Sequence, residues 1–66
     1  MQIQLNNEAK EVPEGTSVGQ LIDQLELKRK FVAVELNQEL IPRERHDEHL
    51  LASGDKIEIV TFVGGG

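Results

Sequence analysis

A single amphipathic helix is the feature that most limits the folds open to this chain. Its apolar residues recur at spacings of three and four, which places them on one helical face: Val18, Leu21, Ile22 and Leu25. Just before them, Ser17 and Gln20 form a predicted capping box, which satisfies free backbone donors at a helix start. A helix cannot bury such a face alone, so the rest of the chain must provide a sheet to cover it.

Five segments are predicted as strands from their alternation or their β-branched residues: residues 1–5, 9–12, 32–36, 39–41 and 56–63. Turn residues separate them at Asn6-Asn7, Asn37-Gln38 and Ser53-Gly54-Asp55. Pro42 ends the short fourth strand or places it at a sheet edge. With the first and last strands as central neighbours, this order predicts an α+β fold of the β-grasp type.

Two polar segments suggest sites, but we predict a solvated loop for each. The run Lys28-Arg29-Lys30 is expected to be a connector, helped by the negative end of the preceding helix. Residues 43–49 are expected to be a loop with a helical turn. Within them, His46 and His49 invite a metal or acid–base role, but their spacing is too sparse for a closed metal site. The scattered glutamates offer no catalytic pair, so we predict neither a catalytic residue nor a metal site.

Length and charge exclude several classes of protein. At 66 residues the chain holds one domain at most, and without cysteine it has no disulfide, thiolate metal site or cysteine nucleophile. The net charge of −5 argues against nucleic acid and favours a partner with a basic docking face, although the same charge also keeps a small protein soluble. Residues 1–5 carry no export or membrane-insertion pattern, so we expect a cytoplasmic protein with no membrane partner.

The sequence closes with three glycines, Gly64, Gly65 and Gly66. Glycine has no side chain to pack and loses the most conformational freedom on ordering, so we expect this tail to be mobile. Three extended residues reach roughly 10 Å, which is enough to carry a carboxylate into a neighbouring active site. A phosphate-binding loop is not predicted, because no helix follows to supply aligned amides. Without further signals, an incidental disordered end would remain the alternative.

Five ordered stretches resemble their counterparts in the ThiS family of sulfur carrier proteins: VPEGTSV (12–18), VAVELN (32–37), IPR (41–43), GDKIEIV (54–60) and VGGG (63–66). The resemblance covers the whole chain in order and in length. It implies a ubiquitin-like β-grasp domain over residues 1–63, followed by a reactive tail over residues 64–66.

The resemblance also implies a function in thiamine biosynthesis. An adenylyltransferase of the ubiquitin-activating type, ThiF-like, would adenylate the carboxylate of Gly66. A sulfur-donating enzyme would then supply the sulfur of a thiocarboxylate, which a ThiG-like thiazole synthase uses to build the thiazole ring. Gly64 and Gly65 would supply slender backbone. The protein would thus be a cosubstrate and not an enzyme, with no bound cofactor and only a transient adenylate and thiocarboxylate.

The last strand also predicts a docking surface. Ile57 and Ile59 share one face, whereas Val60 and Phe62 fall on the other. By the same alternation, Phe31 lies opposite the core residues of its strand. We therefore interpret Phe62 and Val60, with Phe31 beside them, as an exposed apolar patch that docks the activating enzyme. The alternative is a bulge that turns Phe62 into the core.

Two other functions share parts of this pattern. A related carrier for molybdopterin synthesis or tRNA thiolation would have the same fold and glycine end, but the short chain and triple glycine favour the thiamine pathway. A non-reactive binding module resembling the TGS regulatory domains would need no free glycine end, and an acidic surface suits nucleic acid poorly.

Overall fold

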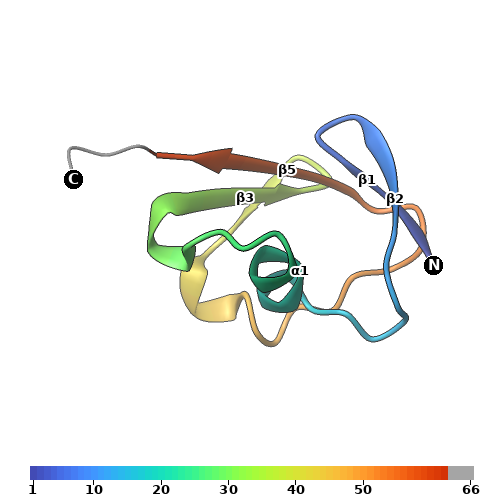
Figure 1. Cartoon of the computed structure of the whole chain (residues 1–66), viewed down its shortest axis with the longest axis horizontal. Helices are drawn as coiled ribbons and strands as arrows, with labels where there is room; N and C mark the ends of the chain where they lie inside the picture. Colours follow the sequence, from blue (N-terminus) through green and yellow to red (C-terminus); the bar gives the residue numbers. More distant parts are fainter. Residues whose placement is uncertain (63–66) are drawn as a thin grey trace.

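A five-stranded mixed sheet carries one helix across one face in the computed structural model, which describes residues 1–62 (Figure 1). The strands are β1 (Gln2–Leu5), β2 (Glu8–Glu11), β3 (Val32–Leu36), β4 (Glu39–Ile41) and β5 (Lys56–Thr61). They lie in the order β2-β1-β5-β3-β4, with β1 and β5 parallel and the other pairs antiparallel. The first and last strands are therefore central neighbours, and the predicted β-grasp arrangement is confirmed.

Both hairpins turn through pairs of residues with left-handed backbone. The φ angles are 50° and 69° at Asn6 and Asn7, and 51° and 71° at Asn37 and Gln38. Two consecutive residues of this kind form the tight turn whose twist matches that of antiparallel strands. The asparagines tolerate this conformation at little cost. The predicted turns β1–β2 and β3–β4 are therefore confirmed.

The helix α1 (Val18–Gln24) begins and ends on signals in its own sequence. At its start, Ser17 Oγ accepts a hydrogen bond from the Gln20 amide, and Gln20 Oε1 accepts one from the Ser17 amide, as the capping box predicts. At its end, Glu26 has a φ of 60° and its amide donates to the Asp23 carbonyl. The Leu27 amide donates to the Ile22 carbonyl, which completes a Schellman motif and stops the helix.

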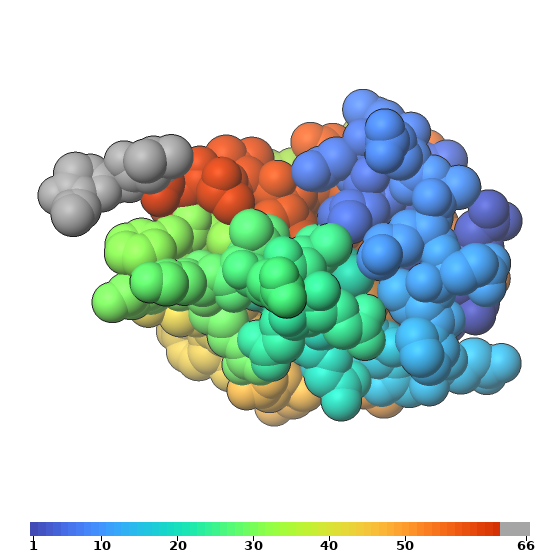
Figure 2. Space-filling model, viewed as in Figure 1, coloured from blue at the N-terminus to red at the C-terminus, as the bar shows by residue number. Residues whose placement is uncertain are grey.

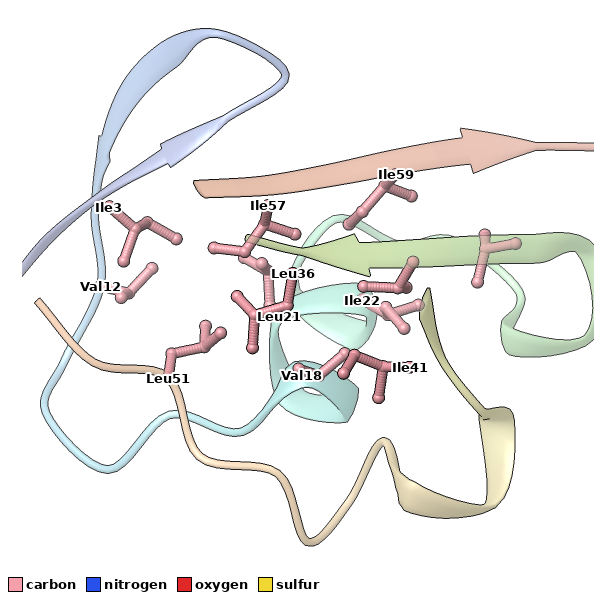
Figure 3. Close-up of a cluster of buried hydrophobic side chains, with 12 residues drawn as sticks. Ile3, Val12, Val18, Leu21, Ile22, Leu36, Ile41, Leu51, Ile57 and Ile59 are labelled. Carbon is pink, nitrogen blue, oxygen red and sulfur yellow. The ribbon is translucent and has the colours of Figure 1, made fainter. Parts of the chain in front are cut away.

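The core lies between α1 and the covered face of the sheet (Figure 3). Its buried apolar residues are Ile3, Val12, Val18, Leu21, Ile22, Val32, Val34, Leu36, Ile41, Leu51, Ile57 and Ile59. Three of the four predicted helix residues belong to it, whereas Leu25 is only partly buried because the helix has already ended at Gln24. Within residues 1–62, no helix is long and apolar enough to cross a membrane.

The chain between β4 and β5 passes under the helix start and is not simply a solvated loop. It opens with the predicted helical turn, η2 (Arg43–Arg45), and then supplies two carbonyls to the first turn of α1. The Gly19 amide donates to the His46 carbonyl at 2.8 Å, and the Val18 amide donates to the His49 carbonyl at 2.9 Å. Because these helix amides have no partner within the helix, the segment completes its N-terminal cap.

The prediction of a solvated loop over residues 43–49 differs most clearly from the structure at His46, whose side chain is buried with 1% exposure. Its Nε2 lies 3.1 Å from the Ile41 carbonyl, to which only a protonated nitrogen can donate. Its buried Nδ1 has no partner among residues 1–62. His49 in the same segment is half-buried. The prediction of a solvated loop was therefore wrong for His46, whose buried ring bonds to β4 and whose carbonyl accepts the Gly19 amide of α1.

The second polar segment, Lys28-Arg29-Lys30, also differs from its prediction as a solvated connector, and the difference lies at Arg29. Arg29 lies in η1 (Arg29–Phe31) and forms ion pairs with Asp23 of α1 and Asp47 of the β4–β5 connection, both at 2.7 Å. The hydrogen bond from Arg29 and its nearby charge hold the pKa of Asp23 below its ordinary value. Arg29 thus ties together two segments that are distant in sequence, instead of serving as a solvated connector charge.

Candidate functional site

The last strand, β5, lies at the centre of the sheet and contains all but one of the last described residues. β5 ends at Thr61, and the Phe62 amide then donates to the Phe31 carbonyl at 2.6 Å, which holds the last described residue beside the start of β3. Figure 1 shows this end of β5 on the side of the molecule opposite Met1. The reactive end and tail predicted at Gly64, Gly65 and Gly66 lie outside the described residues, and their roles stay predictions.

Alternate residues of β5 face opposite sides of the sheet. Ile57 and Ile59 are buried under α1, whereas Val60 and Phe62 are 57% and 53% exposed on the open face, which is the sheet face away from α1. The alternative of a bulge that turns Phe62 into the core is therefore wrong. The predicted docking role of these side chains is a separate matter and stays a prediction.

An apolar patch gathers on the open face beside the end of β5. It consists of Ala33, Val60 and Phe62, with Leu40 one row away, opposite Glu35. Ala33 lies directly opposite Val60 across the β3–β5 ladder, and Leu40 of the edge strand lies on the same face at 64% exposure. Leu40 was not predicted, although the alternation of β4 with Ile41 pointing to the core carries that signal.

Phe31, the third predicted docking residue, is brought to the border of this patch. It is half-buried in η1, where its carbonyl accepts the Phe62 amide. The Lys30 ammonium lies 5.2 Å from the centre of its ring, within the range of a cation–π contact. The sheet thus places all three predicted docking residues together, with a positive charge at the border.

Acidic side chains flank the apolar patch along the sheet. Glu35 of β3 lies directly opposite Glu58 of β5 on the open face, and both are exposed. Like charges placed directly opposite each other are unfavourable in a sheet. A partner with basic side chains would relieve this repulsion, as the net charge of −5 also suggests.

The described residues were also compared with the arrangement that a metal site requires. Within residues 1–62, no group of three or more His, Asp or Glu side chains could hold a metal ion. The ring of His46 is buried and bonded to the main chain, away from the open face. Among residues 1–62, the geometry therefore places an apolar patch beside the end of β5.

Comparison with known proteins identifies the family among those that share this fold. The model of the ThiS family matches residues 3–66. The chain belongs to the ThiS family. The sulfur carrier protein ThiS of Escherichia coli (strain K12) is 33% identical over 66 residues, which is 100% of both chains.

Two further comparisons support this ThiS assignment. A crystal structure of the thiamine biosynthesis protein ThiS from Geobacter metallireducens matches with a TM-score of 0.85 and 33% identity, over 100% of both chains. A thiazole synthase of Paramagnetospirillum magneticum is 35% identical over 66 residues, which is 100% of this chain but 20% of that protein. The resemblance predicted from the five ordered stretches and the ubiquitin-like β-grasp fold are confirmed.

Proposed function

We propose that this protein is a sulfur carrier of thiamine biosynthesis, whose Gly66 carboxylate is adenylated by a partner and converted to a thiocarboxylate. The observation that carries this proposal is a ThiS-family domain with three glycines following the central strand β5. The protein is then a cosubstrate and not an enzyme. Its fold serves to present one carbon atom to the active sites of other proteins.

The chemistry at Gly66 requires a partner because a carboxylate is a poor electrophile. A carboxylate oxygen bonds to the α-phosphorus of ATP and pyrophosphate leaves, which gives an acyl adenylate. The terminal sulfur of a persulfide on the sulfur-donating enzyme then attacks the carbonyl carbon and AMP leaves, which gives an acyl disulfide. A second thiol attacks the donor's sulfur in that disulfide, so that the S–S bond breaks, the two thiol sulfurs end as a disulfide and the thiocarboxylate leaves. The partners are a ThiF-like adenylyltransferase and a sulfur-donating enzyme. Because activation consumes ATP, we expect the reaction in the cytoplasm.

The acceptor of the sulfur is a ThiG-like thiazole synthase. Support comes from the Paramagnetospirillum magneticum thiazole synthase, which contains a segment similar to this whole chain. A carrier domain that shares a polypeptide with a thiazole synthase is expected where the two act together, since a short tether raises their effective concentration. A separate carrier must instead bind its synthase through its surface.

The apolar patch is the proposed docking surface for the adenylyltransferase. Val60 and Phe62 are exposed large apolar side chains that lie directly before the tail. Burial of such side chains at the centre of an interface supplies much of its binding energy. Glu35 and Glu58 beside them would then face basic side chains of the enzyme, which speeds association and sets orientation.

Intact mass tests the proposed function. The protein is incubated with ATP, a sulfur source and a thiamine-pathway adenylyltransferase of verified activity, and a mass gain of one sulfur in place of one oxygen is expected. A variant with one extra residue after Gly66 is the control, because it moves the carboxylate and should stay unmodified. An unmodified wild-type chain, or a modified extended chain, would contradict the proposal.

Substitution of Phe62 tests the docking surface. Phe62→Ala should slow adenylation by roughly 10-fold or more at low carrier concentration, as truncation of an interface anchor does, and should leave the fold intact. Leu50→Ala is the matched control, since Leu50 is 61% exposed but lies beside Ser17 at the helix start. Unfolding of Phe62→Ala, seen by circular dichroism, or an equal loss in Leu50→Ala would overturn the assignment.

A further inference from the structure

The second half of β5 has a neighbouring strand on only one side. β1 pairs with β5 only at Gln4↔Lys56 and Leu5↔Ile57, whereas β3 pairs with it as far as Val32↔Thr61. Figure 1 shows β5 running on past the tip of the β1–β2 hairpin. In the space-filling view of Figure 2, the red surface of β5 is exposed between the blue hairpin and the end of the described chain. A free sheet edge therefore lies directly before the tail.

Asn6 ends the pairing between β1 and β5. Its amide donates to the Ile57 carbonyl at 2.9 Å, and the chain then turns away at a φ of 50°. Its side chain continues the ladder in place of the next residues: Oδ1 accepts the Ile59 amide at 2.9 Å, and Nδ2 donates to the Ile59 carbonyl at 3.3 Å. The asparagine thus satisfies Ile59 and leaves the following position of this edge open.

That open position is Thr61. Main-chain groups of alternate residues point to the same side of a strand, so the N–H and C=O of Thr61 point to the same side as those of Ile59. On the other side, the Phe62 amide is already bonded to Phe31. Neither main-chain group of Thr61 has a hydrogen-bond partner on its open side among residues 1–62.

The length of the remaining chain determines what must cover this edge. From Phe62, the four residues 63–66 span at most about 14 Å, whatever their conformation. If Gly66 is adenylated as proposed above, the adenylyltransferase must approach the end of β5 within that distance. Its surface then excludes water from Thr61, and a buried main-chain donor or acceptor without a partner weakens the complex.

We propose that the adenylyltransferase adds an extended segment of its own main chain to this free edge of β5. The Thr61 N–H donates to a carbonyl of the enzyme, and the Thr61 C=O accepts an amide of the enzyme. Such strand addition supplies affinity through main-chain hydrogen bonds and fixes the direction of the strand that it joins. The direction in which the chain leaves the domain toward Gly66 is thereby set, and Asn6 acts as a positioning residue that keeps β1 from occupying the edge.

A pair of variants at one position tests this inference, which rests on the proposed function. Thr61→Pro removes the N–H, and proline is tolerated in a strand where the lost N–H faces a free edge. Thr61→Val retains the N–H and a β-branched side chain. Adenylation at low carrier concentration should be roughly 5- to 100-fold slower in Thr61→Pro than in Thr61→Val, the loss expected from one unpaired buried group. Equal rates in two folded variants would overturn the strand addition.

Amide hydrogen exchange of the wild-type protein gives a second test that needs no substitution. In the free protein, the Thr61 amide should exchange much faster than the Phe62 amide, which is bonded to Phe31. In complex with the adenylyltransferase, the Thr61 amide should become protected. A Thr61 amide that stays unprotected in the complex refutes the inference, even if Thr61→Pro fails to fold. Failure of wild-type adenylation refutes both proposals, whereas normal adenylation with an unprotected Thr61 refutes only this one.

Discussion

The two faces of the sheet divide the work of this protein between alternate residues of the same strands. On the covered face, Ile57 and Ile59 pack under α1 and contribute to the core. On the open face, Val60 and Phe62 lie more than half exposed beside the end of the chain. A domain of this size has little core to spare, and the apolar side chains left outside it are the ones that we propose for docking.

The largest expected effect comes from truncating a side chain on the covered face of β5, and the same change on its open face provides the comparison. Ile57→Ala should lower the free energy of unfolding by about 2–5 kcal/mol, because it leaves a cavity in the core. Val60→Ala, on the open face of the same strand, should change it by about 0.5 kcal/mol or less. Urea unfolding followed by circular dichroism measures both. Similar losses at the two positions would show that the faces are not divided as described.

An intermediate effect on the free energy of unfolding is expected in the β4–β5 connection, where the His46 side chain is buried. His46→Ala should lower the free energy of unfolding by about 1–3 kcal/mol, because the Ile41 carbonyl loses its buried donor. His49→Ala is the matched control in the same segment and should have a smaller effect, since its ring is only half-buried. The same urea titration compares them. A larger loss in His49→Ala would contradict the structural role of the His46 ring.

The smallest effect is expected at the exposed ion pair of Asp23 and Arg29. The hydrogen bond from Arg29 lowers the pKa of Asp23, so the pair stabilises the fold above the ordinary range of an aspartate, near pH 4. This contribution is lost as pH falls through the lowered pKa. The small stability difference between wild type and Asp23→Asn should therefore be present at neutral pH and disappear in strong acid. Urea unfolding at both pH values measures it, and a difference independent of pH would contradict it.

The sequence predicted those features whose signals are local. The hairpin turns, the capping box at Ser17 and the two faces of β5 all follow from residues a few positions apart. The burial of His46, the ion pairs of Arg29 and the bonds from Asn6 to Ile59 could not be predicted in this way. Each joins segments that are brought together only by the complete fold, and polar side chains alone do not reveal such partners.

The candidate site was predicted unevenly for the same reason. Val60 and Phe62 followed from strand alternation, and the bulge that would have hidden Phe62 is absent from the described part of β5. Leu40 was missed although it alternates with Ile41 in β4, because only the last strand and the start of β3 were searched for exposed apolar residues. The roles of Gly64, Gly65 and Gly66 came from the family resemblance and their lack of side chains, and they lie outside the described residues.

The pairing of β1 with β5 has a consequence for how the molecule is made. The middle of the sheet joins residues from opposite ends of the chain, such as Leu5 and Ile57. Contacts this far apart in sequence form only after a large loop has closed, and they cannot form at all before the second partner exists. A polypeptide broken off ahead of β5 would lack its central strand and stay unfolded. Synthesis must therefore have passed β5 before there is a stable domain to bind a partner.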